Sequence, residues 1–250
     1  MDVFEELVRL RRAGRKCALA TIIDAQGSIP SHECAKLLVR DDGSFVGTVG
    51  GGCVEAQVWA AAREVMETGR PKRLSFNLGQ DTAYENGLIC GGELEVFLEP
   101  VFPEPRVFIF GAGHISKSLS KIASLAGFAT VVVDDRDTYA NRERFPEAER
   151  VLAGAYEELI PALEINESSF IVIVTRGHRD DLRVLRRAVE TPARYIAMVG
   201  SKRKVIALAK QLESEGVTAE AFERVHAPMG LEIGAVTPEE IAVSVVAEMI

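Results

Sequence analysis

The sequence lacks the features that mark membrane and secreted proteins. No apolar run in its 250 residues approaches the roughly 20 residues that cross a bilayer, and the first residues do not resemble a signal peptide. No Cys-x-x-Cys pair occurs among the four cysteines, which disfavours a disulfide framework or a structural zinc site. We therefore expect a protein of the reducing cytoplasm with no membrane partner.

A basic half or stripe is also missing. The net charge is -8, and acidic residues outnumber basic ones both up to Pro103, by 15 to 11, and beyond it, by 22 to 18. Binding to a nucleic-acid backbone is thereby excluded as a main task. No repeat or low-complexity tract is visible, and 47% hydrophobic residues can form one large core or two of ordinary size.

The hydrophobic pattern changes at a proline-rich segment, residues 99–105, where we place a domain boundary. We predict an α+β domain over residues 1–101 and a Rossmann-like parallel sheet domain over residues 102–250, so the fold class is α/β. The expected elements of the first domain are helices over residues 3–13 and 54–66, strands over 17–23, 35–40, 45–49, 73–77 and 94–98, and turns over 27–30 and 41–44. The expected strands of the second are residues 107–110, 131–134, 170–174 and 195–199.

Two of the cysteines lie in glycine runs. Gly50-Gly51-Gly52-Cys53 precedes a predicted helix, and Cys90-Gly91-Gly92 precedes a predicted strand. Glycine adopts positive φ without steric cost and lets a ligand approach the main chain, so these loops suit a sulfur that meets a partner molecule. Cys17 lies in an apolar strand pattern instead, and we interpret it as a buried small hydrophobic residue.

A nucleotide-binding pattern opens the second domain. The strand over residues 107–110 leads into Gly111-Ala112-Gly113, a helical segment follows, and the next strand ends at Asp134. This context and an acid about 20 residues after the glycines match the dinucleotide fingerprint, in which the acid accepts from ribose hydroxyls. Ser116 takes the third glycine position. The alternative is a Rossmann fold that has lost its ligand.

Three more segments place polar groups at the same expected edge of the sheet. His114 begins the first helix, where it either contacts a ligand or is a neutral histidine bonded locally. Arg176 and His178 follow the strand over residues 170–174. Ser201, a predicted N-cap, comes before three cations at a helix start, which favours an anion site over a merely solvated charge run. Those three cations are Lys202, Arg203 and Lys204.

Taken together, these motifs resemble the XdhC/CoxI family, whose members are accessory proteins of molybdenum hydroxylases such as xanthine dehydrogenase. The resemblance covers nearly the whole chain. It rests on Gly27-Ser28-x-Pro30, Ala35-Lys36, Gly47-x-Val49-Gly50-Gly51-Gly52-Cys53-x-Glu55, Gly87-Leu88-x-Cys90-Gly91-Gly92, Phe110-Gly111-Ala112-Gly113-His114, Asp134-Asp135-Arg136, Thr175-Arg176-Gly177-His178, Gly200-Ser201-Lys202-Arg203-Lys204, Pro228-Met229-Gly230-Leu231 and Thr237-Pro238-Glu239-Glu240-Ile241-Ala242.

The resemblance implies a carrier of the molybdenum cofactor, a phosphorylated pterin dithiolene that sometimes carries a nucleotide. Such proteins protect the cofactor, support its sulfuration with a cysteine desulfurase, and deliver it to an apo molybdenum hydroxylase. It also implies cofactor contacts from Gly51, Gly52, Glu55 and Gly91, with Cys53 or Cys90 touching the metal or relaying sulfur. We expect a cofactor chaperone, working as a homodimer, rather than an enzyme with its own turnover.

One segment departs from the family pattern, and two alternative functions remain open. Cys34 stands where a glycine is expected, and we interpret it as a neutral replacement rather than a third functional thiol. The main alternative function is an NAD(P)-dependent oxidoreductase in which Asp134 binds the ribose, although it leaves Cys53 and Cys90 unexplained. The other is a cysteine-rich metal or iron-sulfur module, which the irregular cysteine spacing disfavours.

Overall fold

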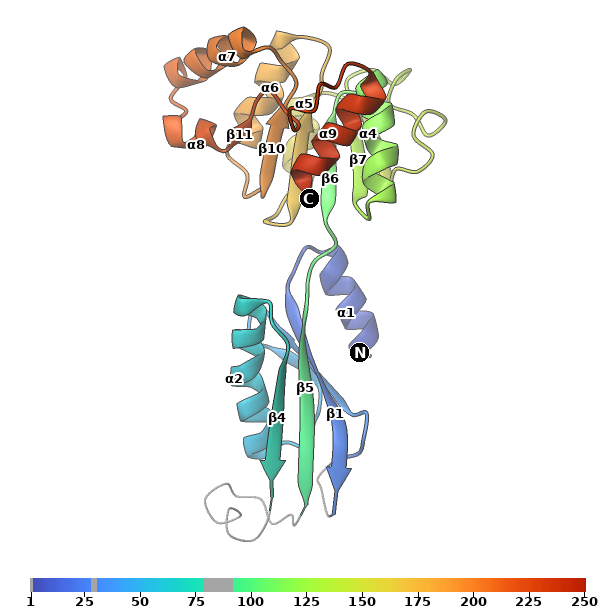
Figure 1. The fold of residues 1–250 in the computed structure, drawn as a ribbon, viewed down its shortest axis with the longest axis vertical. Helices are drawn as coiled ribbons and strands as arrows, with labels where there is room; N and C mark the ends of the chain where they lie inside the picture. The colour runs from blue at the N-terminus through green and yellow to red at the C-terminus, as the bar shows by residue number, and fades with distance from the viewer. Residues whose placement is uncertain (1, 28–30, 79–91) are drawn as a thin grey trace. The chain divides into compact units, whose positions relative to one another are not determined.

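The computed structural model describes residues 2–27, 31–78 and 92–250 (Figure 1). The chain forms two compact units, one ending at Pro103 and one beginning at Glu104, which we call unit 1 and unit 2. The predicted turn over residues 27–30 and the loop with Cys90 and Gly91 fall wholly or partly outside the described residues.

Unit 1 contains an antiparallel sheet with a helix against each face. Among its described residues the strand order is β3-β2-β1-β5-β4, and every neighbouring pair is antiparallel. The α+β prediction for this part is confirmed. The elements are α1 (Val3–Arg12), β1 (Cys17–Gln26), β2 (Lys36–Arg40), β3 (Phe45–Gly47), α2 (Gly52–Thr68), β4 (Lys72–Asn77) and β5 (Glu93–Val101).

Alternation along the strands decides which side chains form the core of unit 1. In β5 the side chains of Leu94, Val96 and Leu98 are buried, and they pack with the apolar face of α2. On the opposite face Leu10 of α1 packs on Cys17, which is completely buried. Burial raises the pKa of the Cys17 thiol to about 11, so this cysteine is the inert apolar residue that the sequence predicts.

A buried carboxylate joins α1 to the sheet. The side chain of Glu6 is fully buried and accepts hydrogen bonds from Arg9 at 2.7 Å and from Arg40 of β2 at 2.6 Å. These two guanidinium groups, Arg9 first, lower the pKa of Glu6 from 4.5 to about 2. The ion pairs therefore stabilise the folded state as long as the carboxylate is ionised.

Replacing Glu6 by glutamine is expected to lower the melting temperature at pH 7. Because the folded pKa is depressed, the contribution is fully present above pH 4.5 and is lost as the pH falls toward about 2. The gap between variant and wild type should therefore narrow between pH 5 and pH 3 in thermal melts followed by circular dichroism. Glu5→Gln, at an exposed position of the same helix, is the matched control. A gap independent of pH would contradict this account.

Unit 2 is a parallel sheet between two layers of helices. The strand order is β11-β10-β9-β6-β7-β8, with all pairs parallel, and the predicted Rossmann-like fold is confirmed. Its strands are β6 (Arg106–Phe110), β7 (Ala129–Asp134), β8 (Arg150–Ala153), β9 (Ser169–Ile173), β10 (Tyr195–Met198) and β11 (Val225–His226). Its helices are α4 (His114–Leu125), α5 (Tyr156–Leu159) with a following 3-10 turn, α6 (His178–Ala188), α7 (Lys202–Ser214), α8 (Ala219–Glu223) and α9 (Pro238–Met249).

Alternate residues of the central strand β6 separate the two helical layers. Val107 and Ile109 join the core beneath α4 and α9, whereas Phe108 and Phe110 join the core beneath α5, α6 and α7. The chain leaves β6 toward β7 on one side and continues at β9 on the other, so the strand order reverses between β6 and β9. Ligands of open parallel sheets bind outside the carboxyl ends of the strands at such a reversal.

The last helix begins as its sequence predicts. The hydroxyl of Thr237 accepts from the Glu240 amide at 3.2 Å, and the Glu240 carboxylate accepts from the Thr237 amide at 3.0 Å, with Pro238 in the first turn. Over residues 2–27, 31–78 and 92–250, none of the helices has the length and apolar character needed to span a membrane.

Candidate functional site

The two glycines of the Gly111-Ala112-Gly113 loop have different roles. Gly111 has a φ of +106°, and a Cβ there would lie 2.4 Å from the carbonyl oxygen of Val174. It therefore allows the loop to pass close to the end of β9. Gly113 has an ordinary φ of -78°, and a Cβ there would meet no atom within 4 Å. Gly113 thus leaves open space at the start of α4.

Asp134, predicted to accept from a ribose, is bound within the protein. Its side chain is 1% exposed and accepts from the Ala112 amide at 2.7 Å and from the Arg136 guanidinium at 2.8 and 3.0 Å. Burial alone would raise the pKa of Asp134, but these donors outweigh it, and the pKa lies below its usual range. The carboxylate fixes the glycine loop, and its contact with a ribose stays a prediction.

A cavity of about 300 Å³ opens at the N-terminus of α4, where the strand order reverses. The first hydrogen bond of the helix runs from the Lys117 amide to Gly113, so the preceding amides have no acceptor within the helix. The Ser116 hydroxyl is buried and has no hydrogen-bond partner among the described residues, a costly state that a ligand acceptor would relieve. The lining residues are Gly113, His114, Ile115, Ser116, Arg136, Val174, Thr175 and Arg176.

Two arginine side chains line this cavity, and each is paired with carboxylates: Arg136 with Asp134 and Asp135, and Arg176 with Asp135 and Asp180. Arg176 is 58% exposed, with Asp135 at 3.4 Å. Arg136 also lies 3.9 Å above the Tyr139 ring. Arg144 reaches the same loop through a hydrogen bond to the Ala112 carbonyl at 3.2 Å. Free helix amides, an unpartnered hydroxyl and guanidinium groups form a site suited to a phosphate group.

The candidate anion site at α7 is only partly available. Ser201 caps the helix by accepting from the Lys204 amide at 3.3 Å, as predicted. Lys204 turns inward and forms an ion pair with Asp181, which is completely buried and accepts from the Thr175 hydroxyl at 2.7 Å. Lys202 and Arg203 are exposed. Of the three cations, Lys204 therefore has a structural role, and Lys202 and Arg203 are open to a ligand.

His178 does not line the cavity at the N-terminus of α4, which we call the phosphate-type cavity. It begins α6 and lines a separate cavity of about 350 Å³ together with Ser201, Arg203 and Lys204. Of the residues predicted in unit 2, the structure therefore brings Gly113, His114 and Arg176 into one cavity. It brings His178, Ser201, Arg203 and Lys204 into another.

In unit 1 the three consecutive glycines all have positive φ and lead into α2, which begins at Gly52. Gly50, Gly51 and Gly52 have φ values of 119°, 75° and 58°, and Cys53 follows in the first turn of the helix, half-buried. Glu55 accepts from the Thr48 hydroxyl at 2.5 Å and the Val49 amide at 3.3 Å, so it holds this segment. The Cys53 side chain packs in part against the core beneath α2, whereas a Cβ at the preceding Gly51 would meet no atom within 4 Å.

Metal binding by Cys53 and Cys90 remains untested by the structure. Cys90 lies outside the described residues, and in the part of the chain that is described no three His, Cys, Asp or Glu side chains are arranged to hold a metal ion. Cys34 is exposed and has a φ of +65°, the left-handed region that favours glycine. This backbone explains why a glycine is expected at that position.

Sequence reasoning does not assign Ser116, Arg136, Arg144 or Tyr139 to the site. The sequence marks Ser116 only by its place in the glycine pattern and Arg136 only as part of a motif. Arg144 and Tyr139 lie in an irregular segment between β7 and β8, where no local pattern indicates that the chain folds back to the glycine loop. The serine at the third glycine position is the signal by which the sequence could have assigned the Ser116 hydroxyl to the site.

Comparison with known proteins gives consistent matches. A model of the XdhC Rossmann domain matches residues 107–249, and a model of the XdhC and CoxI family matches residues 10–77. The uncharacterised protein YqeB of Escherichia coli is 36% identical over the whole of this chain and 46% of its own length. A protein of Bacillus subtilis described as a probable subunit of xanthine dehydrogenase is 32% identical over 62% of this chain and 45% of its own.

Two further matches extend over most of both chains. The molybdenum cofactor insertion chaperone PaoD of Escherichia coli is 24% identical over 95% of this chain and 83% of its own. A crystal structure described as a xanthine dehydrogenase from Bacillus halodurans matches with a TM-score of 0.54 and 24% identity, covering 100% of this chain and 95% of that one, which supports the fold. The chain spans about half the length of YqeB and of the Bacillus subtilis relative.

Proposed function

Because the chain belongs to the XdhC and CoxI family, we propose that it binds the molybdenum cofactor and serves as an accessory protein for a molybdenum hydroxylase of the xanthine dehydrogenase type. The relatives described as a molybdenum cofactor insertion chaperone and as part of a xanthine dehydrogenase support this role. The cofactor is the cargo of such a protein rather than its resident group.

The observation that carries the proposal is the cavity at the N-terminus of α4. Its unpartnered Ser116 hydroxyl, the free first-turn amides and the guanidinium groups of Arg136 and Arg176 fit the terminal phosphate of the cofactor or of its nucleotide form. Gly113 leaves room for the phosphate oxygens at that point. The pterin phosphate is the part of the cargo whose chemistry these residues match.

The cysteines supply the sulfur chemistry in this proposal. Cys53 stands in the first turn of α2, and Cys53 or Cys90 contacts the molybdenum or relays sulfur. The protein protects the cofactor, supports sulfuration by a cysteine desulfurase, and delivers the cofactor to the apo-hydroxylase in the cytoplasm. We propose that it does so as a homodimer.

The structure weighs against the oxidoreductase alternative. That function needs Asp134 as the acceptor for the ribose of NAD(P), and the Asp134 carboxylate is already bound to the Ala112 amide and to Arg136. Freeing it would break an ion pair beneath the glycine loop. The carrier function makes no such demand.

The test is to purify the protein without oxygen from cells that synthesise the cofactor and to measure bound molybdenum and pterin per chain. We expect near-stoichiometric amounts of both from the wild type. Cys53→Ser should lower the melting temperature only slightly, because the side chain is half-buried at the edge of the core, and should lose most of the bound molybdenum or the ability to activate an apo-hydroxylase. Cys34→Ser, at an exposed thiol, is the matched control. It should change neither the melting temperature nor the amount of bound molybdenum.

Two results would contradict the proposal. Wild-type protein without pterin but with bound NAD(H) would favour the oxidoreductase. Loss of cofactor accompanied by an equal loss of stability in Cys53→Ser would assign that thiol to the core.

A further inference from the structure

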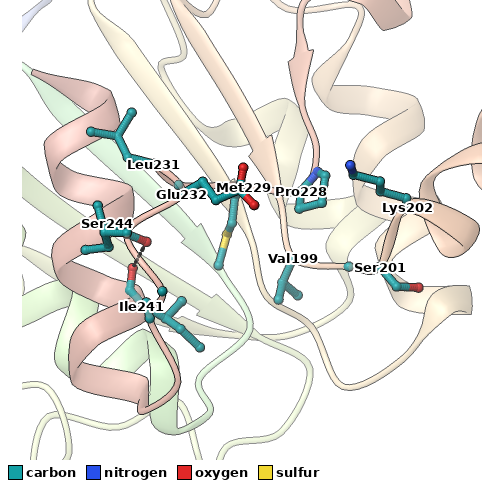
Figure 2. A pocket seen from close by; sticks show the side chains of 14 residues that line it. Val199, Ser201, Lys202, Pro228, Met229, Leu231, Glu232, Ile241 and Ser244 are labelled. Carbon is teal, nitrogen blue, oxygen red and sulfur yellow. Dashed lines mark hydrogen bonds between the residues drawn. The ribbon is translucent and has the colours of Figure 1, made fainter.

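A third cavity, of about 590 Å³, lies beside the carboxyl end of β10 (Figure 2). Its walls come from three segments far apart in the sequence: the loop after β10, the segment of residues 228–235 that follows β11, and the first turns of α9. This volume is within the range of cavities that bind small molecules. The family motif at residues 228–231 contributes to this cavity. No role for this motif was predicted from the sequence.

The floor of this cavity is apolar. Val199, Met229 and Ile241 belong to the buried core beneath α9 or pack against it, and Pro228 forms the side nearest α7. The Ser244 hydroxyl is bound to the Ile241 carbonyl at 2.8 Å, as Figure 2 shows, so it is satisfied within α9. An apolar surface of this kind packs against the face of a heteroaromatic ring.

Two charged side chains line the cavity without a protein partner. Within residues 92–250, neither Glu232 nor Lys202 has a hydrogen bond or ion pair through its side chain. Figure 2 shows Lys202 and Pro228 on one side, Leu231 and Ser244 on the other, and Glu232 between them. Both charged side chains are exposed to solvent. A carboxylate offers two acceptor oxygens and no donor, so its chemistry matches a ring edge that presents neighbouring N–H groups.

We propose that this cavity binds a 2-amino-4-oxopyrimidine ring, the edge that a pterin and a guanine share. Glu232 accepts from the ring N–H and the adjacent amino group, the apolar floor covers the ring face, and Lys202 contacts the carbonyl oxygen or a phosphate. The inference rests on the proposed function, because the cofactor contains such a ring. It adds two residues to the site: Glu232, which lies outside the motifs, and Met229, whose motif had no assigned role.

The position of the cavity relative to the phosphate-type cavity supports one ligand across both. The phosphate-type cavity lies between the ends of β6 and β9. The cavity of about 590 Å³ lies at the end of β10, the next strand along the same edge. At about 4.8 Å between neighbouring strands, one and a half spacings separate the two cavities by roughly 7 Å along the sheet edge. A pterin with a phosphate arm, or a guanine nucleotide, places its ring and its phosphate in this relation.

The experiment titrates the full chain with 6-hydroxymethylpterin, with GMP and with AMP, whose ring lacks the paired N–H edge. Binding is measured by pterin fluorescence and by calorimetry for wild type, Glu232→Gln and the control Glu213→Gln, an exposed glutamate of α7. Glutamine keeps the shape of Glu232 but presents a donor beside an acceptor. We expect Glu232→Gln to weaken the pterin or GMP at least tenfold, with AMP weak throughout and Glu213→Gln unchanged.

The probes separate the two sources of the ring. Preference for the pterin assigns the cavity to the cofactor's pterin, and preference for GMP assigns it to a guanine nucleotide, and both support the proposed ring chemistry. Equal affinities for GMP and AMP, no binding of either ring, or unchanged affinity in Glu232→Gln would overturn it. The proposed function is judged independently, because molybdenum and pterin carried by the purified wild type do not depend on how the free rings bind.

Discussion

Gly111→Ala is expected to destabilise unit 2 by more than about 4 kcal/mol, a large part of the stability of an ordinary domain. The new Cβ would lie 2.4 Å from the Val174 carbonyl oxygen and 2.9 Å from the Thr175 Cα, and both belong to backbone that cannot turn away. The φ of +106° adds strain for any residue with a side chain. Chemical unfolding followed by circular dichroism would show the loss as a large fall in the denaturant midpoint.

Gly113→Ala is the matched control two residues later. Its φ is ordinary and the Cβ has open space, so the stability should fall by about 1 kcal/mol or less. The methyl group would occupy the space that we assign to the phosphate, so the cofactor content should drop in a folded protein. A Gly111→Ala variant as stable as Gly113→Ala would show that the loop does not pass the end of β9 in this way.

Lys204→Met is expected to cost about 3–5 kcal/mol, because it leaves the Asp181 carboxylate buried without its cation. Lys202→Met, on the same turn of α7, removes an exposed lysine with no partner among the described residues and should change the free energy of unfolding by no more than about 0.5 kcal/mol. Denaturant unfolding of the two variants side by side makes the comparison.

A double variant shows whether the cost comes from the unpaired charge. Asp181→Asn combined with Lys204→Met removes both charges and leaves an amide that still accepts from the Thr175 hydroxyl. It should regain much of the stability lost in Lys204→Met. If Lys202→Met and Lys204→Met were equally mild, both lysines would belong to the open anion site that the sequence suggested.

Local signals in the sequence were enough for most of the elements. The N-caps Ser201 and Thr237, the hairpin turn before β3 and the alternation in β5 depend on residues close together in the chain, and the structure agrees with each. The strands β8 and β11 were not predicted. They are short and only partly buried edge strands, so their apolar pattern is weak and the neighbouring strand fixes them.

Local propensity and strand-helix alternation were enough to predict the two fold types, the glycine loop with its helix, and the phosphate-type motifs along one sheet edge. The contacts of the polar groups depend on the tertiary structure. In the folded chain Asp134 accepts from the glycine loop, and Lys204 pairs with Asp181. The Ser116 hydroxyl has no partner among the described residues, and Glu232 lines the same cavity as the loop after β10. Burial and pairing depend on residues that folding brings together from distant parts of the chain, so no local pattern encodes them.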